Sequence, residues 1–147
     1  MEFRVRIPLV HTLGIELVDL QPGQAVLAVE VAENLTNSWG VAHGGLTMTL
    51  LDVAMAHAAR NPAELDGPVQ AGAVTIEMKT TFMRPGKGRL LARARCVHRT
   101  ASLAFCEAEV RGADDELVAQ ATGTFKHLRG LPAGDRGRDI HRPDASD

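Results

Sequence analysis

The sequence predicts an α+β fold in which a curved antiparallel β-sheet is wrapped around one long central helix. One apolar run has the composition of a helix, and four strand-like runs follow it with short polar turns between them. A sheet and a single helix bury their apolar faces most economically by packing against each other. The 147 residues, 45% of them hydrophobic, suit one domain with one core.

The first expected strand is Gln24–Val31. This segment is rich in β-branched and small apolar residues, and it follows a turn signal at Gln21-Pro22-Gly23. A polar stretch over Asn34–Ser38 and a glycine-rich turn then lead into the long apolar run. One strand is therefore expected before the helix.

The central helix is expected over Leu46–Ala59, before Asn61-Pro62. This run is too long and too rich in Leu, Met and Ala for a strand. Its apolar residues leave no wide polar face, and a helix that is apolar on nearly all sides is a buried one. We therefore expect the helix to be buried all round.

The remaining strands follow a loop that contains Pro62 and Pro68. The turns between them are short enough for antiparallel hairpins, and two runs partly alternate apolar with polar residues, as a sheet with one covered face requires. The expected strands are Ala73–Phe82, Arg89–His98, Ser102–Arg111 and Leu117–Lys126. We expect one domain over residues 1–128 and a disordered tail over residues 129–147, which is heavy in Gly, Pro, Asp and Arg without periodicity.

Composition and charge exclude several classes of protein. The formal net charge of -2 gives no general attraction to nucleic acid, and four Phe, one Trp and no Tyr offer no platform for stacking bases. The first residues do not read as an export signal, and no apolar run reaches the roughly 20 residues that span a bilayer. We therefore expect a cytoplasmic protein that acts on a small molecule and binds neither nucleic acid nor a membrane.

The histidines and cysteines carry no metal or redox motif. The histidines are scattered without ligand spacing, so no metal is expected. Cys96 and Cys106 lack the close pairing of a zinc knuckle or redox motif, so we expect two reduced thiols in the core.

Asp52 is the most informative residue because it lies in the middle of the apolar helix. A buried carboxylate is costly unless it is paired, hydrogen-bonded or used chemically. One interpretation is structural, in which Asp52 caps a loop or pairs with a basic side chain. The other is catalytic, and the sequence upstream adds weight to it.

The segment before the helix has the composition of an oxyanion site. Asn37, His43, Gly44 and Gly45 lie in a polar, glycine-rich approach to the helix. Free backbone N–H groups and the positive end of the helix dipole stabilise negative charge there. Glycine also lets a substrate carbonyl approach the backbone closely.

The spacing of these groups favours a site built from two chains. Gly44 and Asp52 are eight residues apart, roughly 12 Å along a helix. A nucleophile or general base acts within about 3 Å, or through one water, so Asp52 cannot easily serve a carbonyl held at the start of its own helix. We therefore expect an obligate dimer with composite sites.

Three segments together resemble a known family. Asn37 to Gly45, with Asp52 seven residues further on, is similar to the signature of the hotdog-fold thioesterases of the PaaI-like group. The strand that ends in Phe82-Met83-Arg84-Pro85 and the segment Leu103-Ala104-Phe105 are similar too. The resemblance covers roughly Leu9 to Leu128 and implies the hotdog fold.

The resemblance implies hydrolysis of an acyl-CoA thioester to a free acid and coenzyme A. Asp52 would be the nucleophile or the general base, and Gly44 would donate its backbone N–H to the thioester oxygen. Asn37 would orient the lytic water or polarise the carbonyl from the facing subunit, and Thr75 stands where the group often has a hydroxyl residue. His43 would either hydrogen-bond the thioester or hold the turn before the helix.

The resemblance also implies a homo-oligomer, a dimer of dimers, with no cofactor because coenzyme A is part of the substrate. Basic residues at the mouth of a site suit the phosphates of coenzyme A, although a solvated hairpin rim explains each of them equally well. Trp39 would line the acyl pocket or pack at the subunit interface. The residues expected to bind substrate are Gly45, Trp39, Met48, Met55, Arg84, Lys87 and Arg99.

The acyl group and two rival functions stay open at this point. Apolar pocket residues suit an aryl-acetyl or a medium-chain acyl group alike. A hotdog hydratase or dehydratase would need a proton-shuttling histidine, either His43 or His57. A non-catalytic acyl-CoA binding protein would gain nothing from an unpaired carboxylate at Asp52.

Overall fold

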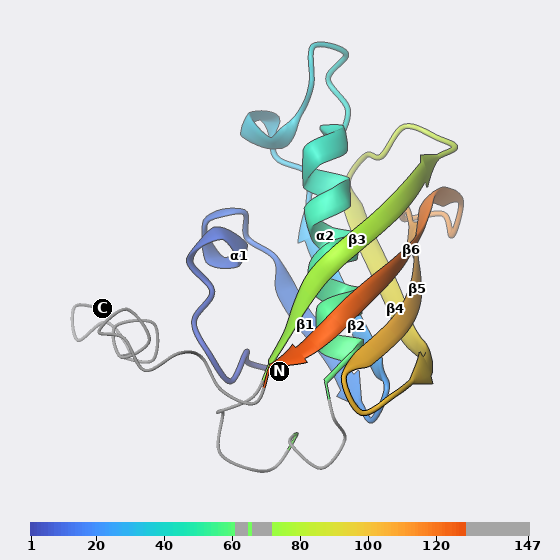
Figure 1. Cartoon of the computed structure of the whole chain (residues 1–147). Coiled ribbons are helices and arrows are strands. Elements are labelled where there is room, and N and C mark those ends of the chain that lie inside the picture. Colours follow the sequence, from blue (N-terminus) through green and yellow to red (C-terminus); the bar gives the residue numbers. More distant parts are fainter. Residues whose placement is uncertain (61–64, 66–71, 129–147) are drawn as a thin grey trace, which may run out of the picture.

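The fold consists mainly of one antiparallel sheet and one long helix (Figure 1). The structure is a computed structural model, which describes residues 1–60, 65 and 72–128. The six strands lie in the order β1-β2-β4-β5-β6-β3, and the helix α2 contacts every one of them. The helices are α1 (Pro8–Thr12), the 3₁₀ turn η1 (Glu33–Leu35) and α2 (Gly44–Ala58). The strands are β1 (Glu16–Gln21), β2 (Gln24–Glu30), β3 (Gly72–Phe82), β4 (Arg89–Arg99), β5 (Leu103–Arg111) and β6 (Leu117–Leu128). The α+β prediction and the hotdog arrangement are confirmed.

The predicted strand Gln24–Val31 is confirmed as β2 (Gln24–Glu30), but it is the second strand and not the first. A strand, β1, and a short helix, α1, precede it, and Pro22-Gly23 forms the hairpin turn that joins β1 to β2. Gly23 takes a φ of +74°, which favours glycine. The Pro22-Gly23 turn was predicted correctly, but of the two strands it joins only the second was predicted from the sequence. The predicted tail, residues 129–147, lies outside the described residues.

The expectation that α2 is buried all round also needs correction. Its sheet-facing side is buried, but Asp52, Val53 and Ala56 are half-buried and Met48 is 37% exposed. The sheet covers only one side of the helix in a single chain. The buried helix residues are Leu46, Thr47, Leu50, Leu51, Ala54, Met55 and Ala58. An apolar helix with one open side leaves surface that a second layer can cover.

β3 is an edge strand with an irregularity in its middle. Its register against β6 shifts between Thr75 and Glu77. A bulge reverses the alternation of faces, so Thr75 and, beyond the bulge, Met78 and Phe82 all face α2, whereas Lys79 lies on the outer face. The bulge therefore turns both ends of the strand toward the helix.

The outer face of the sheet is polar and lies away from α2. A shallow hollow of about 610 Å³ on this face is lined by side chains such as Arg93, Glu109 and Gln120, and by no residue predicted for the site. Arg95 and Glu107 form an ion pair there at 2.5 Å, with both side chains largely exposed. In the described part of the chain, no helix is long and apolar enough to cross a bilayer.

Candidate functional site

The start of α2 is capped by His43. Its Nδ1 accepts a hydrogen bond from the Gly45 N–H at 2.9 Å, and its carbonyl accepts from the N–H groups of Leu46 and Thr47. This is an N-cap in which an imidazole nitrogen replaces the usual side-chain oxygen. The Gly45 amide, predicted to bind substrate, is therefore already engaged. Among the described residues, no acceptor is assigned to the Gly44 amide.

Asn37 organises the loop that leads to this cap. Its Oδ1 accepts hydrogen bonds from the N–H groups of Trp39, at 2.9 Å, and Val41, at 3.4 Å. A bridge between Thr36 and Ala42 closes the loop. Because the carbonyl of the Asn37 side chain is occupied, the two N–H donors of its amide are the groups left to meet a ligand.

Phe82 covers the first turn of α2. A Cβ added to Gly44 would lie 3.5 Å from Cζ of Phe82, so the ring stands over the Gly44 backbone. The loop after β3 is held in place by the Ala42 N–H, which donates to the Gly86 carbonyl at 2.8 Å. Phe82 was not among the predicted site residues, although its place before Met83-Arg84-Pro85 in the signature strand was a usable signal. The ring therefore packs beside Gly44 at the start of α2.

Asp52 is held by a hydroxyl on the edge strand. The Thr75 hydroxyl donates to Oδ1 of Asp52 at 2.6 Å, and no basic partner of Asp52 is found in the described part of the chain. The structural interpretation of an internal ion pair therefore does not hold there. One carboxylate oxygen is fixed by Thr75, while Oδ2 is left to act on a water or a carbonyl.

The two halves of the predicted site lie at different levels of one continuous helix. Gly44 is the first residue of α2, and Asp52 follows eight residues later, about 12 Å along the axis. The spacing assumed from the sequence is therefore real, because no break interrupts the helix. The Asp52 pair and the Gly44 amide cannot meet on one carbonyl within a single chain.

Of the three apolar residues predicted to contact substrate, two are exposed and one is buried. Trp39 is 86% exposed at the tip of its loop, and Met48 is partly exposed on the uncovered side of α2. Met55, in contrast, is fully buried, and its Cε would lie 3.2 Å from a Cβ placed on Gly123 in β6. Met55 therefore packs in the core between α2 and β6, and the expectation that it lines a substrate pocket is corrected.

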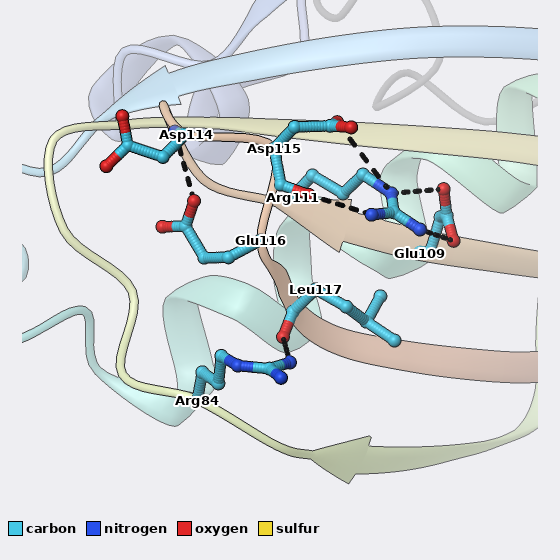
Figure 2. A network of polar contacts seen from close by, with 7 residues as sticks. All are labelled: Arg84, Glu109, Arg111, Asp114, Asp115, Glu116 and Leu117. Atoms are coloured by element: carbon cyan, nitrogen blue, oxygen red, sulfur yellow. Dashed lines mark hydrogen bonds and ion pairs between the residues drawn. The ribbon is translucent and has the colours of Figure 1, made fainter.

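The three basic residues predicted to meet phosphates have different surroundings. Arg84 donates through Nη1 to the Leu117 carbonyl at 2.9 Å, beside the turn in which Arg111 binds Glu109 and Asp115 (Figure 2). Arg84 thus ties the end of β3 to the start of β6. Its remaining N–H groups are exposed, as is Lys87.

Arg99 lies at the other end of α2. Its guanidinium donates to the carbonyls of Ala59, at 2.7 Å, Arg60, at 2.7 Å, and Ala58, at 3.4 Å. These carbonyls are unpaired within a helix, and a cation is favourable at the negative end of the helix dipole. We therefore correct the assignment of Arg99 to phosphate binding, because it caps the C-terminus of α2.

His57 is packed rather than poised for proton transfer. Its Nδ1 lies 2.8 Å from the Val53 carbonyl, and its ring meets Phe3 edge-on. Burial lowers the pKa of His57, and the hydrogen bond to Val53 opposes this only in part. The histidine that a hydratase would need is not supplied by this residue. Within the described residues, no group of three potential ligands could hold a metal ion.

Comparison with known proteins identifies relatives over most of the chain. Residues 40–119, which include Gly44, Asp52 and Thr75, match the family model described as the thioesterase superfamily. Human acyl-coenzyme A thioesterase 13 is 33% identical over 117 residues, which are 78% of this chain and 79% of the relative.

Solved structures agree with these relatives. The PaaI protein from the phenylacetic acid degradation operon of Escherichia coli superposes with a TM-score of 0.73 and 25% identity, covering 84% of this chain and 86% of the other. A mutant of the phenylacetic acid degradation protein PaaI from Thermus thermophilus superposes with a TM-score of 0.71 and 34% identity, covering 83% and 100%.

Proposed function

The chain belongs to the thioesterase superfamily and is a thioester hydrolase, and we propose that it hydrolyses acyl-CoA at a site where Asp52 of one subunit acts on a carbonyl held by Gly44 of another. The observation that carries this proposal is the Thr75 to Asp52 hydrogen bond of 2.6 Å. It fixes Oδ1 of a carboxylate that has no basic partner in the described part of the chain.

The carboxylate can act in either of two ways. As a general base, Asp52 takes a proton from water while that water attacks the thioester carbon. As a nucleophile, it attacks the carbon directly and forms an anhydride that water then hydrolyses. In both routes the thiolate of coenzyme A leaves, and Thr75 keeps the reacting carboxylate in one orientation.

The start of α2 supplies the stabilisation of the oxyanion. The Gly44 N–H points out of the first turn, where the helix dipole favours negative charge. The amide group of Asn37, in the loop that leads to this helix, offers further donors, because its oxygen is engaged by Trp39 and Val41. Phe82 and the exposed Trp39 would shield this charge from water once the acyl group is bound.

β3 supports the two-subunit arrangement. It lies at the sheet edge with Val74 and Ile76 exposed, and an unpaired edge of 11 residues is a template for another strand. If two β3 strands paired antiparallel about an axis near their middle, the Thr75 end of one would lie beside the Phe82 end of the other. Asp52 of one copy would then approach Gly44 of its partner.

The proposed substrate class is supported by the names of the relatives. Relatives named as acyl-coenzyme A thioesterase and as 1,4-dihydroxy-2-naphthoyl-CoA hydrolase support a CoA thioester. Lys87 and the free N–H groups of Arg84 remain the proposed phosphate contacts. Met48 and Trp39 are the proposed acyl contacts, for an aryl-acetyl or medium-chain group, in a homodimer that pairs further into a tetramer.

A thiol-release assay tests the proposal. The wild type is given a panel of aryl-acetyl, short-chain and medium-chain acyl-CoA substrates, alongside Asp52→Asn, which keeps the shape of the side chain. We expect release from at least one substrate and a loss of kcat of about 10²-fold or more in the variant. No release by the wild type, or equal rates in both proteins, would refute the assigned mechanism.

A further inference from the structure

The two cysteines, ten residues apart in the chain, are direct partners on neighbouring strands. Cys96 of β4 stands opposite Cys106 of β5 in the register of the sheet. The Cys96 N–H donates to the Gly23 carbonyl at 2.8 Å. This bond is on the β2 side of β4, away from β5. The pair is therefore of the non-hydrogen-bonded kind, in which the Cα atoms are about 4.5 Å apart. A disulfide requires about 4.4 to 6.8 Å between Cα atoms, and the pair meets this as the last regular pair before the register shift between Cys96 and His98.

The two thiols share one face but differ in exposure. Cys106 is 3% exposed and lies between the buried residues Ala104 and Ala108, on the face toward α2. Residues directly opposite each other in a sheet project to the same side. Cys96 is half-buried, and its thiol donates to the His98 carbonyl at 3.4 Å. A reagent would therefore reach Cys96 first.

The two sulfur atoms also interact. Burial is the main cause that raises the pKa of Cys106 to about 12, and the charge and hydrogen bond of Cys96 raise it further. Cys106 is thus kept as a thiol while Cys96 remains the accessible sulfur. Both cysteines are free in the structure.

We propose that Cys96 and Cys106 form a two-electron redox site that takes a hydroperoxide and closes reversibly to a cross-strand disulfide. In the first step the Cys96 sulfur attacks the peroxide, an S–O bond forms and the O–O bond breaks, and the Cys96 thiol proton passes to the departing oxygen, which leaves as an alcohol or water. In the second step the Cys106 sulfur attacks the Cys96 sulfur, an S–S bond forms, and the S–O bond breaks. The Cys106 proton leaves with the hydroxyl group as water, and the two thiols are oxidised while the peroxide is reduced.

The site is separate from the proposed thioesterase site. It adjoins Arg99, whose charge favours the Cys106 thiolate and whose guanidinium caps the end of α2. Gly44 lies at the opposite end of that helix. The redox proposal can therefore be tested independently of thioester hydrolysis.

Peptide mapping of the native protein tests the proposal. The folded wild type is treated with hydrogen peroxide, free thiols are alkylated after denaturation, and the digest is analysed without reductant. We expect loss of both alkylatable thiols, a Cys96 to Cys106 linked peptide two hydrogens lighter than the separate peptides, and full recovery of both thiols with dithiothreitol.

Two matched variants assign the order of the steps. Cys106→Ala, which resembles the alanines on either side of it, should stop at a sulfenic acid on Cys96 that dimedone traps. Cys96→Ala should keep its remaining thiol unmodified. The proposal is overturned if the wild type yields the dimedone adduct without the linked peptide. It is equally overturned if the wild type stays unmodified, or if the link forms only between chains or only in denaturant.

Discussion

Thr75 decides how Asp52 can be used. A carboxylate on an open helix face would otherwise sample several rotamers, whereas the hydroxyl at 2.6 Å fixes one oxygen and leaves the other available. The hydroxyl is part of the edge strand, so the orientation of Asp52 depends on the bulge that turns Thr75 inward. One hydrogen bond thus couples the carboxylate to the geometry of β3.

The Thr75 contact predicts a graded series of variants. Thr75→Val removes the hydroxyl at nearly constant shape and should lower kcat about tenfold, as expected when a hydrogen bond to a charged group is lost. Thr75→Ser keeps the hydroxyl and should restore most of the rate, with KM little changed throughout. Equal kcat in Thr75→Val and wild type, measured by thiol release, would show that the contact is merely structural.

The site residues were only partly readable from the sequence. Asp52 could be selected because a carboxylate in an apolar helix is costly, and Gly44 because it opens that helix. Thr75 came only from the family resemblance, because the bulge that aims it inward leaves no mark in the pattern of residues. Met55 and Arg99 were misassigned because their partners, Gly123 and the carbonyls after α2, are distant in sequence.

At the scale of the elements, α2 is fixed at both ends by side chains. His43 caps its first turn, and Arg99 of β4 binds the carbonyls of Ala58, Ala59 and Arg60 at its C-terminal end. Composition and period predicted the helix and five of the six strands to within two residues. β1 was missed because the Gln21-Pro22-Gly23 turn was assigned to the strand after it alone.

Removing the C-terminal cap should destabilise the fold. Arg99→Met keeps the apolar stem but leaves partly buried carbonyls without donors, and it should lower the free energy of unfolding by about 2 kcal/mol. Arg95→Met, which removes an exposed ion pair with Glu107, is the matched control and should cost under about 1 kcal/mol. Urea denaturation of both variants provides the measurement, and equal losses would contradict the capping role.

His57 should make stability depend on pH. Burial lowers its pKa in the folded state below the ordinary value of 6.5. As the pH falls below that value, the unfolded chain binds a proton that the folded chain does not, so stability is lost until the folded pKa is reached. His57→Leu should flatten this part of the profile in urea titrations carried out at pH values below 6.5. If wild type and His57→Leu lose stability equally as the pH falls, the assignment of this pH dependence to His57 is contradicted.

At the scale of the whole molecule, two matching surfaces are left uncovered by the residues that the structure describes. One is the uncovered side of α2, which carries Asp52, and the other is the free edge of β3. Both lie next to the residues proposed to react. The length of the helix between Gly44 and Asp52 is the reason for proposing a site at a subunit boundary, since neither half reaches the other within one chain.

Subunit complementation is the most direct test of this two-chain site. Gly44→Pro removes the proposed N–H donor at the first helical position, where proline is well tolerated, and Asp52→Asn removes the carboxylate. Each homo-oligomer should be inactive while retaining the helical signal in circular dichroism. Purified heterodimers of the two variants contain one site with an intact Gly44 and an intact Asp52, so they should recover up to about half of the wild-type kcat. Heterodimers as inactive as their parents would contradict a site shared between subunits.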